Sequence, residues 1–343
     1  MFQIKNKGLK GYTFIDLFAG LGGFRIALET LGAKCVYSSE INKNAREIYY
    51  KNFKDIPDGD ITKINAKNIP NHDILCAGFP CQAFSISGKQ KGFDDTRGTL
   101  FFDVARIVKM KQPKIVFMEN VKNFASHNAG RTLQTVYKII NDLGYNFNYK
   151  VLNATDYGIP QKRERIYMVC FRNDIYNGAF SFPEPIKLTK HVEDILLSDK
   201  EISNYNQKQK NFSTTNYCFS CDRTVKSSNS PIRLGIVNKG GQGERIYSIK
   251  GTAITLSAFG GGVFSRTGGY LIDGKPRKLF PRECARLMGF PDTYVISEND
   301  NQAYQQLGNS VVIDVLQYIG IKIAEYLQNV LSEECNNSKR LSL

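Results

Sequence analysis

The stretch Phe14-Ile-Asp-Leu-Phe18-Ala-Gly20-Leu-Gly22-Gly23 decides the fold. It opens as an apolar strand and turns through three glycines, and an amphipathic helix pattern begins at about Phe24. A strand, a glycine turn and a helix in this order are typical of nucleotide-binding α/β proteins. The glycine spacing is not G-x-G-x-x-G and no Walker lysine follows, so the turn predicts only close approach of a ligand to the backbone.

The same alternation continues along the chain. Strand patterns occur near residues 13, 34, 73, 114, 149 and 166, and helical patterns such as Leu100 to Lys109 and Thr132 to Leu143 lie between them. This alternation predicts an α/β fold with a mostly parallel, doubly wound sheet that helices cover on both faces. Since the carboxyl ends of such strands line one crevice, polar side chains that follow strands are candidates for one site.

Gly78-Phe-Pro-Cys81-Gln82 follows the apolar strand pattern of residues 73–77. Pro80 fixes its own φ and restricts the residue before it, while Gly78 lets another molecule come close to the main chain. This surrounding favours a reactive thiol at Cys81. An isolated cysteine is more often a small buried apolar residue, so the neighbouring motifs decide between the two.

Charged side chains stand beside the other strands. Glu119 follows the strand pattern 114–118 and could meet Cys81 at one edge of the sheet, or it could cap the next helix. Arg163 and Arg165 precede the strand 166–171; as residues i and i+2 of a strand they would deliver two guanidinium groups to that edge, or form a basic surface rung.

Two further carboxylates, Glu40 and Asp60, follow the second strand and a short turn. Carboxylates at strand ends can hold ribose hydroxyls and an adenine amine. The alternatives are a solvated loop acid at Glu40 and a turn former at Asp60.

In this order the motifs resemble the cytosine-5 DNA methyltransferases. The similar blocks span nearly the whole chain: Asp16 to Gly20, Gly78 to Gln82, Glu119 to Val121, Gln161 to Arg165, Arg282 to Gly289 and Gly308 to Ser310. Gly240 to Tyr247 and Gly260 to Gly262, in the variable region, are also similar to the small bacterial HhaI-type enzymes. Ile41 departs from their pattern, which has an aromatic ring beside the cofactor adenine.

The resemblance implies methyl transfer from S-adenosyl-L-methionine to carbon 5 of a cytosine flipped out of double-stranded DNA. Four catalytic residues follow from it: Cys81 as the thiolate that adds to carbon 6, Glu119 at ring N3, Arg165 at the pyrimidine carbonyl, and Arg163 as nearby positive charge. A base must then remove the proton from carbon 5, and bound water is our prediction.

Cofactor and DNA contacts are also implied. The predicted cofactor-binding residues are Phe18, Gly20, Leu21, Gly22, Gly23, Glu40, Ile41, Asp60, Ile61, Gly78, Pro80, Leu100, Asn309, Ser310 and Val311. The predicted DNA-binding residues are Ser85, Ser87, Lys89, Arg97, Gln242, Arg245, Thr255, Ser257 and Phe259. Among these, Gln242 and Ser87 would fill the gap that the flipped base leaves, and the loop after Cys81 would close over the substrate.

The composition agrees with a polyanionic partner. The 343 residues carry 46 Lys and Arg against 32 Asp and Glu, a net charge of +14. Between residues 233 and 279 we count eleven of the 29 glycines and eight basic residues against two acids, which suits a DNA groove or, alternatively, a solvated β surface. We therefore predict a catalytic domain at residues 1–196 and 309–343 and an inserted target-recognition domain at residues 197–308.

The other sequence features predict the setting. Eight cysteines without compact spacing indicate reduced thiols in a cytosolic protein, and we expect no metal site. We see no signal peptide and no apolar run that could span a bilayer, so we expect a monomer in the bacterial cytoplasm, associated with the nucleoid. A restriction endonuclease would act on the same DNA site without forming a stable complex.

Three other functions remain open at this point. A tRNA cytosine-5 methyltransferase would keep the chemistry and change the substrate, a nonenzymatic DNA-binding regulator would keep the fold without turnover, and a nicotinamide enzyme would use the thiol differently. The intact Cys81, Glu119 and Arg165 argue against the regulator, and the glycine-rich segment with Gln242 and Arg245 favours duplex DNA. A short G·C palindrome such as GCGC, methylated at the inner cytosine, is the predicted target.

Overall fold

A computed structural model describes residues 8–80, 100–204, 217–219 and 225–340. The chain forms two compact units. The larger unit contains Phe2–Leu152, Glu164–Glu184 and Val315–Leu343, and the smaller unit contains Asn153–Arg163 and Pro185–Asp314. Each unit is described by itself below.

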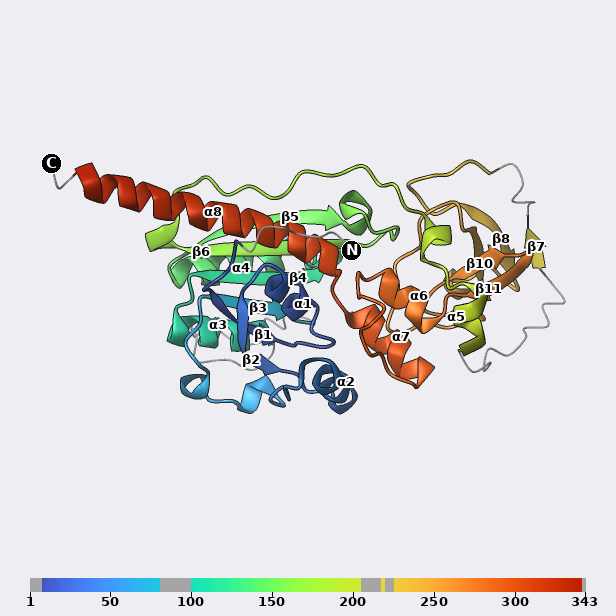
Figure 1. The fold of residues 1–343 in the computed structure, drawn as a ribbon, viewed down its shortest axis with the longest axis horizontal. Coiled ribbons are helices and arrows are strands. Elements are labelled where there is room, and N and C mark those ends of the chain that lie inside the picture. Colours follow the sequence, from blue (N-terminus) through green and yellow to red (C-terminus); the bar gives the residue numbers. More distant parts are fainter. Residues whose placement is uncertain (1–7, 81–99, 205–216, 220–224, 341–343) are drawn as a thin grey trace. The chain divides into compact units, whose positions relative to one another are not determined.

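The larger unit is built on a six-stranded sheet with the order β2-β1-β3-β4-β6-β5 (Figure 1). Its strands are β1 Thr13–Leu17, β2 Lys34–Ser39, β3 Ile74–Gly78, β4 Ile115–Val121, β5 Tyr145–Asn153 and β6 Glu164–Arg172. The pairs β1–β2, β1–β3 and β3–β4 are parallel, and β6 runs antiparallel to β4. The expected mostly parallel α/β sheet is therefore confirmed.

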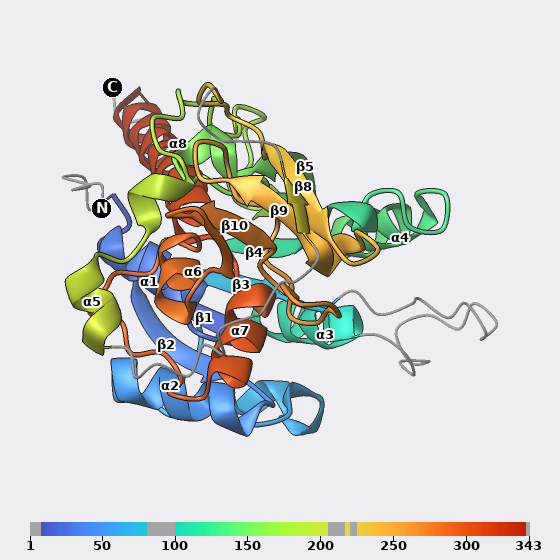
Figure 2. The same ribbon diagram turned by 90° about the vertical axis from the view of Figure 1, so that its right-hand side faces the viewer.

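Helices cover both faces of this sheet (Figure 2). They are α1 Gly23–Thr30, α2 Lys43–Phe53, α3 Leu100–Lys111, α4 Arg131–Asp142 and α8 Ile313–Arg340, with short 3-10 turns η1 Ile61–Lys63, η2 Ala66–Asn68, η3 Lys122–Phe124 and η5 Asn173–Ile175. On one face α3 and α4 pack on β1, β3, β4 and β6 in one apolar core. On the other face, Phe24 of α1 lies edge-on to Phe117 of β4, and Tyr326 of α8 packs on Phe171 of β6.

Helix α8 belongs to a segment, Asp300–Val330, that is long and apolar enough to cross a membrane by length and composition alone. The expectation that no such segment exists is therefore wrong. Most of the segment is buried inside the protein: Leu316, Ile319 and Ile323 are completely buried, and Leu31, the C-cap residue of α1, fills the space beside Gly320. The core helix of a soluble protein has these same properties, because its apolar face is covered by neighbouring elements.

The smaller unit contains a five-stranded sheet with the order β11-β10-β9-β8-β7. Its strands are β7 Tyr217–Phe219, β8 Arg233–Val237, β9 Arg245–Ser248, β10 Gly269–Ile272 and β11 Lys275–Lys278. Its helices are α5 Asp199–Asn204, α6 Pro281–Arg286 and α7 Asp300–Asn309, with η4 Ala154–Tyr157, η6 Val192–Ile195 and η8 Gln242–Glu244. A small core of Leu234, Val237, Ile246, Phe264 and Leu271 lies under the sheet.

The division of the chain differs from the expected one in three segments. Residues 153–163, 185–196 and 309–314 pack with the smaller unit, whereas we had placed them with the catalytic domain. The main chain explains the first of them: Ala253 N donates to Pro160 O at 2.7 Å, and Lys162 N donates to Ala253 O at 2.8 Å. The functional assignment of the two domains stays a prediction.

Candidate active site and DNA-binding site

Glu119 lies at the carboxyl end of β4, inside the sheet of the larger unit. Its neighbours in register are Gly78 on β3 and Tyr167 on β6. The residue is only 8% exposed. Register therefore places this carboxylate beside the residue that stands three positions before Cys81, as expected for strand ends that share one edge.

Arg165 forms an ion pair with this carboxylate. Its Nε lies 3.2 Å from Oε1 of Glu119, and the two side chains are 14% and 10% exposed. A further guanidinium nitrogen, Nη1, donates to Glu164 O at 2.8 Å, which fixes the plane of the group. A nearly buried pair of this kind is a preorganised electrostatic site, since neither group has to reorient when charge develops next to it.

Asn120 holds the main chain that leads toward Cys81, the predicted nucleophile. Its Nδ2 donates to Phe79 O at 2.9 Å, and its Oδ1 accepts from Val121 N at 2.8 Å. The side chain is almost completely buried. Sequence reasoning missed this role; the available signal was an amide directly after the predicted catalytic acid in Glu119-Asn120-Val121.

Cys81 itself lies outside the described residues, as do Ser85, Ser87, Lys89 and Arg97. The described cysteines Cys35, Cys76, Cys170 and Cys284 are free thiols. Burial is the largest cause that raises the pKa of each, to about 12 for Cys35. They are therefore unreactive at neutral pH, because the thiolate is the nucleophilic form.

The glycine turn has the tight backbone that a close ligand requires. Phe18, Gly20 and Gly22 all have positive φ, at 57°, 54° and 73°. A Cβ on Gly22 would lie 2.5 Å from the ring of Phe53, so this position has no room for a side chain. Leu21 and Gly23 are buried beneath the turn, and α1 begins at Gly23.

Glu40 connects this turn to the start of α2 by hydrogen bonds. Its Oε2 accepts from Gly20 N at 2.8 Å and its Oε1 accepts from Asn42 N at 2.7 Å. Each carboxylate oxygen has a second lone pair, so Glu40 can still accept from ribose hydroxyls. The side chain thereby does two things: it shapes the turn and it presents acceptors.

Asp60 caps the short helix η1. Its Oδ1 accepts from Thr62 N at 3.1 Å and from the Thr62 hydroxyl at 2.7 Å, and these bonds lower the pKa of the carboxyl. The turn-forming interpretation is therefore correct. Oδ2 lies 4.0 Å from Lys63 Nζ, a distance that leaves its lone pairs able to accept from an amine donor. Ile61 is buried beside it, whereas Ile41 is 68% exposed.

The donor set of the larger unit fits S-adenosyl-L-methionine. Two carboxylates, a narrow glycine turn and apolar side chains offer acceptors and backbone contacts without a phosphate cradle, because no basic residue is among them. Gly78 and Leu100 are partly buried and Pro80 is exposed. Asn309, Ser310 and Val311 belong to the smaller unit, where Ser310 and Val311 are buried.

Arg163 does not lie on a strand with Arg165. Strand β6 begins at Glu164, one residue later, so the i, i+2 rule that placed the two guanidinium groups together does not apply. Arg163 is 3% exposed and belongs to the smaller unit. Its Nη1 donates to Leu256 O at 3.0 Å, and its Nη2 donates to Gly308 O at 3.0 Å and to Ser310 O at 2.6 Å.

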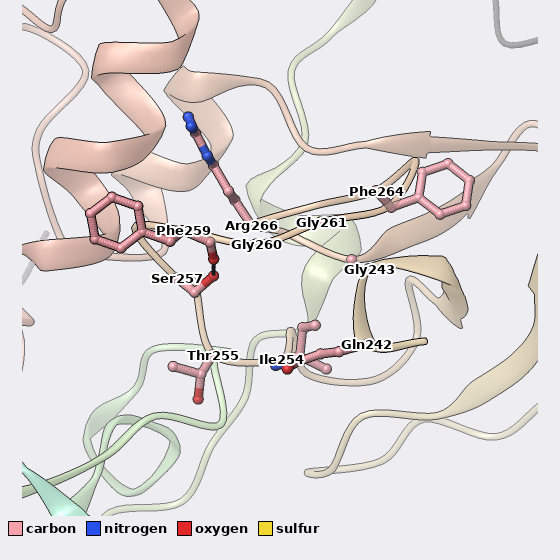
Figure 3. A pocket seen from close by; sticks show the side chains of 11 residues that line it. Gln242, Gly243, Ile254, Thr255, Ser257, Phe259, Gly260, Gly261, Phe264 and Arg266 are labelled. Atoms are coloured by element: carbon pink, nitrogen blue, oxygen red, sulfur yellow. Dashed lines mark hydrogen bonds between the residues drawn. The ribbon is translucent and has the colours of Figure 1, made fainter. Parts of the chain in front are cut away.

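Four of the predicted DNA-binding residues line one cavity of ≈ 210 Å³ in the smaller unit (Figure 3). These are Gln242, Thr255, Ser257 and Phe259, and Phe259 is 70% exposed. The Ser257 hydroxyl donates to Phe259 O, which orders the turn between them. Arg245, on β9, is half-buried and is not among the lining residues.

Arg266 also lines this cavity and was not singled out from the sequence. Its Nη1 donates to Asn301 O at 2.7 Å, and its φ is 76°. The only signal was its place among the eight basic residues of 233–279. An arginine at the wall of a cavity lined by amide and hydroxyl groups suits a phosphate or a base edge.

A family model described as C-5 cytosine-specific DNA methylase matches residues 12–325. The chain belongs to this family. The type II methyltransferase M.HhaI of Haemophilus parahaemolyticus is 62% identical over 327 residues, which are 95% of this chain and 98% of that protein. The type II methyltransferase M.HpaII of Haemophilus parainfluenzae is 42% identical over 93% of this chain and 91% of its own length.

The fold is shared more widely. The crystal structure of S. pombe Dnmt2 methyltransferase is similar with a TM-score of 0.67, over 93% of this chain and 99% of that one, at 21% identity. Membership of the family makes the chain a DNA (cytosine-5) methyltransferase that uses S-adenosyl-L-methionine. Of the functions left open by the sequence, the tRNA methyltransferase, the regulator and the nicotinamide enzyme are thereby set aside.

Proposed function

We propose that this enzyme methylates the inner cytosine of GCGC and is the protective half of a type II restriction-modification pair. The observation that carries the proposal is the 62% identity to a type II methyltransferase over 95% of the chain. The cavity lined by Gln242, Thr255, Ser257 and Phe259 supports it. A cognate endonuclease acts on the same site without forming a stable complex.

The catalytic residues are Cys81, Glu119 and Arg165. The Cys81 thiolate adds to carbon 6, which moves an electron pair toward carbon 5 and N3 of the cytosine. Glu119, which must first take up a proton, donates it to N3 as the acid, and Arg165 holds Glu119 in place and faces the ring carbonyl. These groups stabilise charge that develops on the ring during addition and is absent from the bound substrate, so they act on the transition state more than on bound substrate.

When it is bound, S-adenosyl-L-methionine supplies the electrophilic methyl group. Glu40 would accept from the ribose hydroxyls, Asp60 Oδ2 from the adenine amine, and the turn Phe18 to Gly23 would surround the methionine end. Release of the enzyme needs loss of the carbon 5 proton to water, after which the bond from carbon 6 to the Cys81 sulfur breaks and the 5,6 double bond returns.

The smaller unit reads the duplex, and the loop after Cys81 helps to open it. Gln242 and Ser87 would occupy the gap left by the flipped base and bond to the unpaired guanine, while Arg245 and Arg266 contact a guanine or a phosphate. Ser85, Lys89 and Arg97 would contact the backbone from the loop after Cys81. The enzyme works as a monomer in the bacterial cytoplasm, associated with the nucleoid.

Bisulfite sequencing of a plasmid methylated by the purified enzyme tests the site. We expect conversion-resistant cytosines only at the inner position of GCGC, and Cys81→Ser enzyme should leave every cytosine convertible while binding the cofactor normally. Protection at another sequence would overturn the GCGC assignment. Normal turnover by Cys81→Ser would remove Cys81 from catalysis.

A further inference from the structure

The structure joins two segments that the proposed function treats separately. One is the DNA-reading strap, which we define as residues 253–259. The other is the cofactor segment, residues 309–311. Both belong to the smaller unit, and the residues that connect them are Pro160 to Arg163, which we call the clamp.

The clamp holds the strap by five hydrogen bonds. Besides the two main-chain bonds of Ala253, the Thr255 hydroxyl donates to Lys162 O at 2.5 Å, Leu256 N donates to Gln161 Oε1 at 3.0 Å, and Arg163 Nη1 donates to Leu256 O at 3.0 Å. Gln161 is completely buried, and its Nε2 donates in turn to Leu287 O at 2.8 Å. The strap therefore cannot shift without moving the clamp, because buried bonds are costly to break.

The same guanidinium reaches the cofactor segment. Arg163 Nη2 donates to Gly308 O and Ser310 O, the carbonyls on either side of Asn309. One rigid planar group thus fixes the strap through Nη1 and the residues around Asn309 through Nη2.

Gly308 makes a second connection that does not depend on hydrogen bonds. A Cβ at this position would lie 2.3 Å from Ala258 N and 2.4 Å from the Ser257 carbonyl carbon. The main chain beside the cofactor segment therefore packs directly on the main chain of the strap. Close-packed groups of this kind transmit a displacement instead of absorbing it.

From this geometry we infer that Arg163 is a positioning residue that couples DNA binding by the strap to cofactor binding by residues 309–311. A duplex that orders the strap also orders the residues around Asn309, so cofactor binds more tightly to the DNA complex. By reciprocity, cofactor tightens DNA binding by the same factor. The inference rests on the proposed function, which assigns DNA to the strap and cofactor to the segment.

The test measures that factor directly. The Kd of S-adenosylhomocysteine is measured by calorimetry with and without a saturating GCGC duplex, and the ratio of the two values is the coupling factor. In Arg163→Lys the ammonium cannot bond the strap and segment carbonyls as a planar fork does, so the coupling factor should fall about tenfold, within the usual range of coupling energies.

Arg282→Lys is the matched control. Arg282 lies in the same unit and also donates to main-chain carbonyls, Pro291 O at 3.4 Å and Tyr294 O at 2.7 Å, and neither carbonyl belongs to the strap or to the cofactor segment. It should leave the coupling factor unchanged. An unchanged factor in Arg163→Lys, or an equal fall in Arg282→Lys, would overturn the inference.

A second measurement needs no variant and covers the case in which Arg163→Lys does not fold. Hydrogen exchange of the peptide 305–312 in the wild-type enzyme should slow at least about threefold when duplex is added without cofactor, since ordering the strap should suppress local opening. If duplex binds and the exchange rate of the peptide 305–312 does not change, the inferred coupling is wrong. Failure to bind duplex or S-adenosylhomocysteine at all would instead refute the proposed function.

Discussion

At the scale of single residues, the ion pair of Arg165 with Glu119 is the feature on which the proposed chemistry depends most. We predict that Arg165→Ala lowers the single-turnover methylation rate by about 10²-fold or more, the usual effect of removing one preorganised group. Loss of its partner also leaves the buried Glu119 carboxylate uncompensated, at a cost of about 3 kcal/mol in the free energy of unfolding. Rapid-quench assays and urea unfolding measure the two effects separately.

Lys122→Ala provides the comparison for this prediction. Lys122 Nζ lies 2.8 Å from Glu164 Oε1 in a second ion pair next to the first, but the side chains are 53% and 37% exposed. Such exposed pairs contribute little to stability. A rate as low as that of Arg165→Ala would mean that general charge at this edge, and not the buried pair, determines the rate.

Asp314 gives the molecule a pH dependence that the mechanism does not use. Burial raises the pKa of its carboxyl to about 6, while nearby Lys190 opposes the rise. As the pH increases from about 4 to 6, the unfolded chain loses this proton before the folded chain does, so the folded state is destabilised over that window. The full shift corresponds to about 2–3 kcal/mol.

We therefore expect Asp314→Asn to be more stable than the wild type above pH 6 by up to about that amount, and equally stable near pH 4. Urea unfolding at the two pH values measures the difference, and Asp142→Asn on the exposed face of α4 should show none. A stability gain that is the same at both pH values would contradict a role for the Asp314 proton.

At the scale of elements, the turn between β1 and α1 combines two constraints on one glycine. Gly22 has a φ of 73°, and the Phe53 ring of α2 occupies the space in which a Cβ of residue 22 would lie. Gly22→Ala should reduce the free energy of unfolding by about 2–4 kcal/mol, through backbone strain and a clash together, and should weaken cofactor binding. Thermal unfolding and cofactor titration are the measurements.

Gly11→Ala separates the two causes. Gly11 has a φ of 94° and no atom lies within 4 Å of a Cβ built there, so the substitution causes backbone strain without a clash. It should cost about 1 kcal/mol and leave cofactor binding unchanged. If Gly11→Ala were as destabilising as Gly22→Ala, the clash with Phe53 would contribute nothing to the loss in the free energy of unfolding.

The elements of the larger unit were predictable because each is encoded locally. The strands expected near residues 13, 34, 73, 114, 149 and 166 correspond to β1 to β6, and the turn at Gly20 to Gly23 precedes α1 as expected. The antiparallel direction of β6 was not predictable, since an apolar run has the same pattern in either direction. The start of β6 at Glu164 is equally nonlocal, and it separates Arg163 from Arg165.

At the scale of the whole molecule, the limits of sequence reasoning are set by long-range contacts. Residues 153–163 lie between two strands of the larger unit, so proximity in sequence assigned them to it. Their partners are distant in sequence: for Arg163, Leu256 lies 93 residues away and Gly308 lies 145 residues away. Composition does not indicate such contacts. The meeting of Glu119 and Arg165 at one edge of the sheet could be predicted from their positions at strand ends, whereas the contacts of Asn120, Gln161 and Arg266 required the folded chain.

Charge is the other property of the whole molecule, and it leads to a prediction about salt. The net charge is +14, and basic residues are concentrated at 233–279. Binding to a GCGC duplex should therefore release several counterions. The Kd should rise steeply between 50 and 200 mM salt, by about 10³-fold if six phosphates are neutralised.

Lys239 is exposed beside the Gly240-Gly241-Gln242 turn, so Lys239→Gln should reduce the slope of log Kd against log salt by about one. Lys34→Gln, at the exposed start of β2 in the larger unit, should leave the slope unchanged. Fluorescence anisotropy across a salt series measures all three slopes. A wild-type affinity that did not change with salt would show that contacts to base edges, and not the phosphate backbone, hold the complex together.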